Sequence, residues 1–275
     1  MGEAIACANQ KGGVGKTTTV VNLGTYLALA GRRVLVIDLD PQGNATSGFG
    51  IDKAEVERSV YDALCETVPA ADLVVPTLVE QLSLIPASLS LAGAEVELAP
   101  LEQRERRLAH ALEPLLPGYD YILIDCPPSL GLLTVNALTA ADSVLIPLQC
   151  EYYALEGLSQ LIATINLVRD HLNPDLAIKG VILTMYDART NLSAEVRDEA
   201  RRHLDGSVFE TIVPRSVRLS EAPSYGRPIA LYRSDSKGAL AYRDLADELL
   251  ARDRRRSATS AQDPRGSAAV AGAGR

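Results

Sequence analysis

Short apolar segments alternate along this chain with longer stretches in which apolar residues recur at helical spacing. The short segments, rich in Val, Ile and Leu, predict strands at residues 4–8, 33–38, 82–86, 121–125, 143–148, 178–185 and 209–213. The longer stretches predict helices at residues 17–30, 101–116, 155–171, 192–204 and 239–254. Because strands alternate with helices, we expect an α/β fold in which one mostly parallel, twisted sheet carries helices on both faces.

The organisation of the chain fits a single domain followed by a short tail. Its 275 residues can bury a large core without disulfides or a structural metal. We assign residues 1–254 to this domain. Residues 255–275 are rich in Ala, Gly and Arg and show no apolar periodicity, so we expect them to be disordered.

Composition excludes several classes of protein. Hydrophobic residues make up 47% of the chain and charged residues 23%, which is typical of a soluble globular protein. No segment approaches the roughly 20 uninterrupted apolar residues that a membrane-spanning helix needs. The first residues lack the basic region of a signal peptide, so we expect a cytoplasmic protein. The four cysteines show no CxxC spacing, which disfavours both a disulfide framework and a zinc site.

Charge is distributed unevenly along the chain. The formal net charge is −8, but residues 252–275 hold six arginines and two aspartates, which leaves −12 for the other 251 residues. Residues 180–243 carry 10 basic and 8 acidic side chains. A nucleic-acid-binding protein usually shows a basic surface, so any such surface here must be local and lie toward the C-terminal part.

The sharpest motif reads QKGGVGKTT, over residues 10–18, and lies between the first predicted strand and the first predicted helix. Glycines in such a turn let successive backbone N–H groups face an anion, and the helix N-terminus adds partial positive charge. Lys16 can then reach the β- and γ-phosphates of a nucleotide, and the Thr17 hydroxyl can ligate Mg²⁺. The motif departs from the common G-x-x-x-x-G-K-T pattern, because Gln10 stands at the first glycine position and Lys11 precedes the glycine pair.

Three aspartates end apolar strands. Asp125 ends the segment YILID, which is too apolar to finish in a charge without a partner, so we expect it to hold Mg²⁺ directly or through water. Asp38 and Asp40 end the second strand two residues apart and therefore face the same side of an extended chain. Two carboxylates in that arrangement repel each other unless a cation or a water network lies between them. For Asp38, a simple turn acid before Pro41 is the alternative.

Several ordered motifs together resemble one known family. KGGVGKTT is similar to the deviant Walker A motif of the ParA/MinD group of P-loop ATPases. VLVIDLDPQGN, residues 34–44, agrees with that group, and ILIDCPP, residues 122–128, looks like its Walker B motif. The Soj-type chromosome-partitioning ParA branch is matched by QCEYYALEG, TMYDARTNLS and VPRSVRLSEAPSYGRPI, at residues 149–157, 184–193 and 213–229. The resemblance runs from about residue 5 to about residue 250 and implies a P-loop NTPase fold of the SIMIBI type.

The resemblance implies ATP hydrolysis with Mg²⁺ as cofactor. The implied ATP contacts are Lys11, Gly12, Gly13, Val14, Gly15, Lys16, Thr17, Thr18, Met185, Pro214 and Arg215. The implied catalytic residues are Lys11, Lys16 and Asp40, and the implied metal residues are Thr17, Asp38 and Asp125. In the family, Asp40 orients the attacking water, and Lys11 reaches across a sandwich dimer to the partner's ATP, so hydrolysis would require a homodimer. The last three ATP contacts would flank the adenine, although core packing is the alternative for Met185.

The resemblance also implies an output on DNA. Arg189 and Arg218 match arginines that the Soj-type branch uses on double-stranded DNA, where contacts to phosphates carry no sequence specificity. Three arginines of the intervening helix, Arg197, Arg201 and Arg202, could widen this surface or could simply be solvated. A ParB-type partner protein would stimulate hydrolysis and release the dimer from the nucleoid.

Other functions on the same scaffold stay open at this point. A MinD-like regulator would end in a basic amphipathic helix, whereas residues 257–275 contain Val270 as their only apolar residue larger than alanine, so we expect no membrane binding. A small-molecule enzyme, such as a dethiobiotin-synthetase-like ligase, would give Lys11 no role. A nitrogenase-iron-protein function would need two cluster cysteines at the dimer axis, and only Cys126 lies near a suitable place. We therefore expect a cytoplasmic, nucleoid-associated partitioning ATPase.

Overall fold

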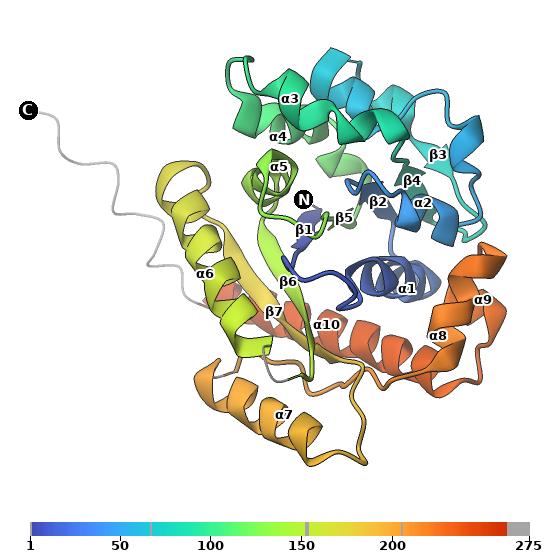
Figure 1. Ribbon diagram of the computed structural model, residues 1–275, viewed down its shortest axis with the longest axis vertical. Coiled ribbons are helices and arrows are strands. Elements are labelled where there is room, and N and C mark those ends of the chain that lie inside the picture. Colours follow the sequence, from blue (N-terminus) through green and yellow to red (C-terminus); the bar gives the residue numbers. More distant parts are fainter. Residues whose placement is uncertain (1, 67, 152–153, 205, 263–275) are drawn as a thin grey trace, which may run out of the picture.

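The computed structural model describes residues 2–66, 68–151, 154–204 and 206–262. Its centre is a seven-stranded sheet in the order β3-β4-β2-β5-β1-β6-β7 (Figure 1). The strands are β1 Glu3–Cys7, β2 Val34–Asp38, β3 Val75–Pro76, β4 Leu82–Ile85, β5 Tyr121–Asp125, β6 Ser143–Gln149 and β7 Ala177–Thr184. Every neighbouring pair is parallel except β3 and β4. This arrangement confirms the predicted α/β fold with a mostly parallel sheet.

Helices cover both faces of this sheet. They are α1 Lys16–Leu29, α2 Asn44–Gly48, α3 Ala94–Leu98, α4 Arg107–Leu112, α5 Leu132–Ala140, α6 Ala154–His171, α7 Asn191–His203, α8 Val217–Glu221, α9 Ile229–Tyr232 and α10 Lys237–Gln262. Helices α1 and α10 pack against each other on one face, while α4, α5 and α6 lie over the other (Figure 1). The predicted covering of both faces is therefore confirmed.

Two apolar cores flank the sheet, because alternate residues of each central strand point to opposite faces. In β1, Ala4 and Ala6 join the core beneath α4, α5 and α6, whereas Ile5 and Cys7 join the core beneath α1 and α10. Strands β2 and β5 are buried at every position. A strand buried on both faces cannot alternate between apolar and polar residues, which explains the continuous apolar runs in the sequence.

The strand predicted at residues 209–213 was wrong. This segment runs beside β7 but forms isolated bridges at residues 208 and 214 instead of a continuous ladder. Between the bridges, the backbone N–H groups of Glu210 and Thr211 donate to the Glu248 carboxylate of α10, at 2.9 and 2.8 Å. Phe209 and Val213 still donate to β7, but the Thr211 N–H between them is taken by α10, so the ladder is interrupted.

The helix predicted at residues 101–116 is shorter than expected. Gln103 has a left-handed backbone with φ of 51°, and α4 begins only at Arg107. The helix ends at Leu112, just before Pro114, which has no N–H to donate to the preceding turn.

The last helix is longer than expected. Helix α10 continues to Gln262, past the predicted domain boundary at residue 254. Residues 255–262 contain neither Gly nor Pro, and Pro264 is the first residue that opposes a helix. The prediction of disorder was therefore wrong for residues 255–262, and residues 263–275 lie outside the described part of the chain.

Candidate functional site

The carboxyl ends of three central strands meet at one edge of the sheet. In the strand register, Cys7 of β1 and Asp38 of β2 both lie beside Asp125 of β5. The chain leaves β1 through the glycine-rich loop of residues 8–15 and enters α1 directly. The predicted phosphate loop and the predicted metal carboxylates therefore lie next to each other, as expected at the carboxyl edge of a parallel sheet.

The loop has the backbone shape that a phosphate cradle needs. Gly13 and Gly15 have φ of 75° and 92°, a region that residues with side chains rarely adopt. The buried Lys16 ammonium donates to the carbonyl oxygen of Lys11 at 3.2 Å, so this side chain lies along the inside of the loop. The Thr184 hydroxyl, at the end of β7, donates to another loop carbonyl at 2.8 Å. These contacts fix the loop against the sheet.

Asp125 is the most unusual group of the site. Its side chain is fully buried, and both carboxylate oxygens lack a hydrogen-bond partner among the described residues. Burial raises the pKa of Asp125 well above its usual value, and the neighbouring carboxylate of Asp38 raises it further. The Thr17 hydroxyl and the Lys16 ammonium lie near enough to oppose this shift, although neither makes a hydrogen bond of ordinary geometry to the carboxylate. A buried charge without a partner is costly, so this carboxylate needs a cation or a proton.

The surroundings of Asp125 fit a Mg²⁺ site. Mg²⁺ prefers oxygen ligands and usually takes one or two protein groups together with substrate phosphates and water. Thr17 is the second residue of α1 and its hydroxyl lies beside this carboxylate, so both oxygens are at the end of the loop. Across the described ranges, no group of three or more His, Cys, Asp or Glu side chains could hold a metal on its own. Phosphate and water oxygens would therefore complete the coordination.

The two aspartates of the β2 end have different surroundings. Asp38 accepts two hydrogen bonds from Thr46 of α2, one from its N–H and one from its hydroxyl, each at 2.7 Å. Burial raises the pKa of Asp38 to about 6, although these bonds oppose the shift. Asp40 accepts a hydrogen bond from the Gln42 N–H at 2.9 Å. Asp38 thus ties α2 to β2, and its part in the metal shell stays a prediction.

Lys11, the second lysine of the loop, has a contact unlike that of Lys16. Its ammonium pairs with the Glu151 carboxylate at 2.6 Å, and both side chains are partly exposed. Glu151 follows β6 and also accepts a hydrogen bond from Gln149. An exposed ion pair of this kind contributes little stability, so Lys11 can change partners at small cost.

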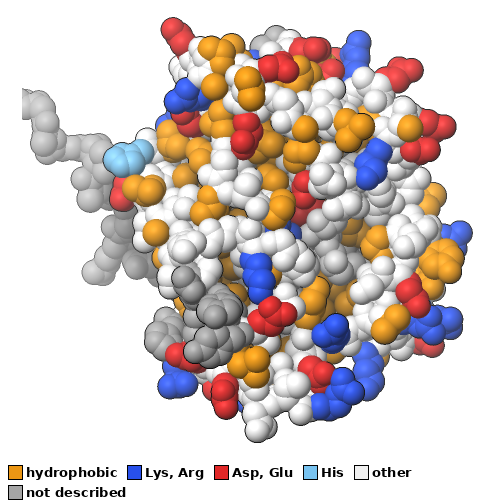
Figure 2. Space-filling view, in the orientation of Figure 1, with side chains coloured by type: hydrophobic (Ala, Val, Ile, Leu, Met, Phe, Trp, Pro, Cys, Tyr) orange, Lys and Arg blue, Asp and Glu red, His pale blue; other side chains and the backbone are white. Residues whose placement is uncertain are grey.

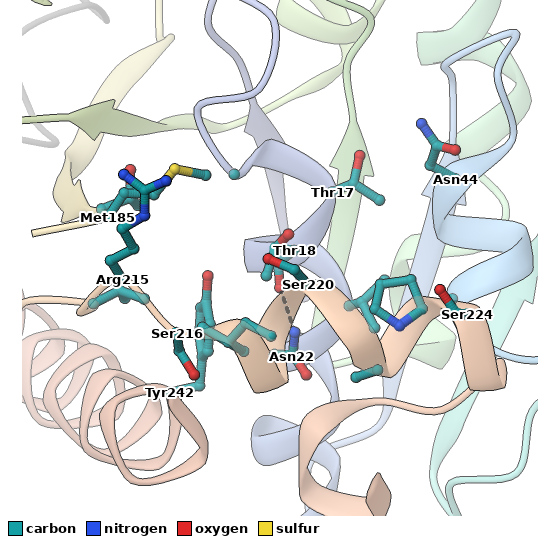
Figure 3. A pocket seen from close by; sticks show the side chains of 18 of the residues that line it. Thr17, Thr18, Asn22, Asn44, Met185, Arg215, Ser216, Ser220, Ser224 and Tyr242 are labelled. Carbon is teal, nitrogen blue, oxygen red and sulfur yellow. Dashed lines mark hydrogen bonds between the residues drawn. The ribbon is translucent and has the colours of Figure 1, made fainter. Parts of the chain in front are cut away.

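A cavity of about 580 Å³ opens between the loop, α1, α2 and residues 213–227 (Figure 3). The three residues predicted beside the adenine, Met185, Pro214 and Arg215, all line it. Met185 is 36% exposed and has a positive φ of 51°, so it is not the core residue that the alternative required. Among the loop residues predicted to contact ATP, three line this cavity: Gly15, Thr17 and Thr18.

Sequence reasoning missed several polar residues of this cavity. They are Asn22, Asn44, Ser216, Ser220 and Tyr242, whose side chains are seen together in Figure 3. The Tyr242 hydroxyl of α10 shares a hydrogen bond of 3.1 Å with buried Thr19 of α1, and Asn22 accepts the Ile229 N–H at 2.7 Å. These residues come from segments far apart in the chain, and no motif marks them, because a single Asn, Ser or Tyr has many ordinary uses.

Comparison with known proteins decides the family. A family model described as an AAA domain matches residues 2–178. The sporulation initiation inhibitor protein Soj of Bacillus subtilis is 61% identical over 251 residues, which cover 91% of this chain and 99% of that protein. The chain belongs to the Soj/ParA family of P-loop ATPases. The chromosome partitioning protein ParA of Myxococcus xanthus is 57% identical, with 92% of this chain and 89% of that protein covered.

Solved structures share the fold of this Soj/ParA chain and contain nucleotide. A Mycobacterium smegmatis protein described as cobyrinic acid a,c-diamide synthase, with bound ADP and magnesium, has a TM-score of 0.81 and 42% identity, and 92% of this chain and 96% of that chain are covered. The septum site-determining protein MinD of Pyrococcus horikoshii, complexed with Mg-ADP, has a TM-score of 0.77 and 27% identity, with 90% and 96% covered. These ligands agree with the predicted ATP and Mg²⁺.

The two arginines that the Soj/ParA resemblance assigns to DNA lie on different segments. The Arg189 side chain is 87% exposed, and its guanidinium donates to both oxygens of Asp187, at 2.9 and 2.7 Å. These bonds lower the pKa of Asp187 well below its usual value. Arg218 of α8 pairs with Glu221 at 2.7 Å. Each arginine is therefore held by a carboxylate of its own segment.

The arginines of α7 are engaged in similar surface contacts. Arg197 pairs with Asp198 and Arg201 with Glu210, each at 2.7 Å, and Arg202 donates to a backbone carbonyl. Exposed pairs of this kind exchange easily, so a wider DNA surface of this Soj/ParA protein stays a prediction. No helix in the described part of the chain is long and apolar enough to cross a lipid bilayer.

Proposed function

We propose that this chain is the ATP-driven switch of a chromosome or plasmid partitioning system. In this function an ATP-bound homodimer holds double-stranded DNA without sequence preference, and hydrolysis releases it. The observation that carries the proposal is the double role of α8. Leu219 and Ser220 line the nucleotide cavity, whereas Arg218, between them and the helix start, is exposed and paired at the surface. A nucleotide that reorders the cavity wall would therefore move a DNA-contacting arginine.

The residues of the loop provide binding and orientation of ATP. Backbone N–H groups of the loop and of the first turn of α1 receive the phosphates, and Lys16 neutralises their charge. Thr17 and Asp125 would hold Mg²⁺, which when bound stabilises charge on the phosphate oxygens. Asp40 orients a water molecule for attack on the γ-phosphorus. ATP and water are thereby converted to ADP and phosphate.

Dimerisation completes the site in this proposal. Lys11 is paired with Glu151 of its own chain in a partly exposed contact, so it is free to exchange partners. In the sandwich dimer that the family resemblance implies, Lys11 faces the ATP of the partner subunit and stabilises the charge that develops during transfer. Hydrolysis by a single subunit is therefore slow, and a ParB-type partner protein acts on the dimer to set the time of release.

The charge of the chain explains why DNA binding would need the dimer. A net charge of −8 repels DNA phosphates over most of the surface. Two subunits present twice as many arginines to one duplex, and each phosphate contact releases counterions. Binding should therefore depend strongly on salt and place the cytoplasmic protein on the nucleoid.

Retention on nonspecific duplex DNA, measured with ATP, ADP or no nucleotide at two salt concentrations, tests this function. We expect ATP to increase retention at least about tenfold over ADP, and salt to weaken it. Arg218→Glu should remove the ATP-dependent increase while ATP-dependent dimerisation remains. Arg243→Glu is the matched control, because Arg243 is an exposed arginine of α10 that pairs with Asp244.

Two results would contradict the proposal. One is an ATP-dependent increase in DNA retention that is as large in Arg218→Glu as in the control Arg243→Glu. It would show that α8 does not contact DNA. A protein that hydrolyses ATP but gains no DNA affinity in any nucleotide state would exclude the partitioning switch. It would favour a small-molecule reaction, of the kind named for the Mycobacterium smegmatis protein.

A further inference from the structure

The chain turns sharply after β2, and Asp40 begins this turn. We call residues 40–43 the Asp40 turn. The Asp40 carboxylate accepts the Gln42 N–H at 2.9 Å, and the Asp40 carbonyl oxygen accepts the Gly43 N–H at 2.8 Å. An aspartate side chain that bonds the backbone two residues further on is held in place by the turn that it closes. The direction of the Asp40 carboxylate therefore depends on where Gln42 and Gly43 lie.

Lys53 lies against the Asp40 turn. Its ammonium donates to the Gln42 carbonyl oxygen at 2.7 Å. Its stem lies over Gly43, because a Cβ atom placed on Gly43 would be 2.6 Å from Lys53 Cδ and 3.3 Å from Lys53 Cγ. Gly43 has a φ of 60°, which favours glycine, so no side chain of this residue competes for the space that Lys53 fills. One side chain thus contacts both residues on which the direction of the Asp40 carboxylate depends.

The backbone around Lys53 is itself fixed by the fold. The Asp52 carboxylate accepts the Ala54 N–H at 2.9 Å and so caps the short helix that Lys53 begins. The Ile51 N–H donates to the carbonyl oxygen of Thr46 in α2 at 3.2 Å. In the upper half of the face drawn in Figure 2, where α2 lies in Figure 1, Lys and Arg side chains stand singly among acidic and apolar ones. A lysine of this region therefore acts through its own contacts and not as part of a basic surface.

We propose that Lys53 is a positioning residue for ATP hydrolysis. It holds the Asp40 turn and thereby keeps the Asp40 carboxylate in the direction from which it orients the attacking water. This role rests on the proposed function, in which Asp40 orients that water. Within the part of the chain that the structure describes, the walls of the nucleotide cavity do not include Lys53. Its replacement should therefore slow the chemical step, because a small displacement of an orienting group lowers the rate strongly, and should leave ATP binding unchanged.

Single-turnover ATP hydrolysis and ATP affinity, measured on the full chain with Mg²⁺ and without DNA, test this role. Lys53→Met keeps the apolar stem and removes the donor, so we expect hydrolysis to slow about fivefold. ATP affinity and ATP-dependent dimerisation should stay within about twofold of the wild type. Lys53→Arg restores a donor and should return the rate to within about twofold of the wild type. Lys237→Met is the matched control, because Lys237 is an exposed lysine at the start of α10.

A double-mutant cycle shows whether Lys53 acts through Asp40. If it does, Lys53→Met should slow the Asp40→Ala protein by less than about twofold, since no carboxylate is left to position. A further loss of about fivefold in the double variant would contradict the proposal, and so would equal rates of Lys53→Met and the Lys237→Met control.

The same rates separate this role from the proposed function. Slower hydrolysis by Asp40→Ala without slower hydrolysis by Lys53→Met would remove only the role of Lys53. Full turnover of Asp40→Ala would remove the water-orienting role of Asp40, and the role of Lys53 with it. Because the measurements contain no DNA, their outcome is also separate from that of the DNA-retention test with Arg218→Glu.

Discussion

Two buried ionic groups lie near opposite edges of the same sheet, and they are satisfied in opposite ways. Lys179, near the edge where strands begin, pairs with both Glu3 and Asp253. Asp125, at the edge where strands end, has no hydrogen-bond partner on either oxygen within the described residues. The paired charge of Lys179 links β1 and β7 to α10. The carboxylate of Asp125, without an ion pair, is available to bind a cation. Both groups are buried, so burial does not distinguish them. Whether the buried charge has a partner does distinguish the structural residue from the functional one.

Replacing the satisfied charge should have the largest effect on stability. Lys179→Met leaves Glu3 and Asp253 without their counter-charge, so we expect the free energy of unfolding to fall by about 3 kcal/mol. Urea unfolding measures this change, and ATP hydrolysis by the folded protein should stay near that of the wild type. A variant that also carries Glu3→Gln and Asp253→Asn should recover most of the loss. A fall below about 0.5 kcal/mol would mean that this cluster behaves as an ordinary surface pair.

Replacing the unsatisfied charge should separate activity from stability. We expect Asp125→Asn to lower ATP hydrolysis about a hundredfold, because it removes the carboxylate that we propose binds the metal. In nucleotide-free, chelator-treated buffer the same change should raise the free energy of unfolding by about 1 kcal/mol, since a costly buried charge is gone. Asp142→Asn, at an exposed carboxylate, is a control for the same side-chain change at the opposite edge. Its carboxylate accepts the Ala4 N–H at 2.8 Å, so it should lose stability. A less stable Asp125→Asn would contradict the comparison.

A smaller effect is expected at Asp40, which lies near the same edge but accepts a hydrogen bond from Gln42. Asp40→Ala should still bind ATP and dimerise, while its turnover falls at least about tenfold because the attacking water loses its orientation. Nucleotide binding and single-turnover hydrolysis, measured on the same preparation of each variant, distinguish the effect of Asp40→Ala from that of Asp125→Asn. Normal turnover would remove Asp40 as the group that positions the water.

The smallest expected effect is a pH dependence of stability. The pKa of Asp125 is raised in the folded protein, so the folded state binds this proton more tightly than the unfolded state. The stability that protonation contributes is present at low pH and is lost as the pH rises through the window between the usual and the raised value. Without metal, the stability advantage of Asp125→Asn over the wild type should therefore grow as the pH rises above about 4. An advantage that stays constant between acidic and neutral pH would show that folding does not raise the pKa of Asp125.

The positions of the phosphate loop and of Asp125 beside it could be predicted because their signals are local. Lys16 and Thr17 stand in one contiguous motif between a strand and a helix, and Asp125 ends an apolar strand. Parallel strands bring their carboxyl ends to one edge, so the sequence order alone places these residues together. The contacts of Met185, Pro214 and Arg215 with the cavity followed from the family resemblance and not from any pattern.

The remaining features depend on contacts between distant parts of the chain. Lys179 meets Glu3 and Asp253 across separations of 176 and 74 residues, and no spacing in the sequence links them. Glu248 takes the Thr211 N–H, which a strand at residues 209–213 would have donated to β7. Helix α5 was missed because it is buried on nearly all sides and therefore shows no alternation of apolar and polar faces.

Thermal unfolding of wild-type protein and Asp125→Asn in ADP, with and without Mg²⁺, tests the central claim most directly. If the Asp125 carboxylate helps to bind Mg²⁺, then Mg²⁺ should raise the unfolding midpoint of the wild type by several degrees more than that of the variant. Without Mg²⁺ the order should reverse, and the variant should unfold at the higher temperature. An equal Mg²⁺ increment in both proteins would contradict the account, because the buried, unpartnered carboxylate would then have no part in holding the cation.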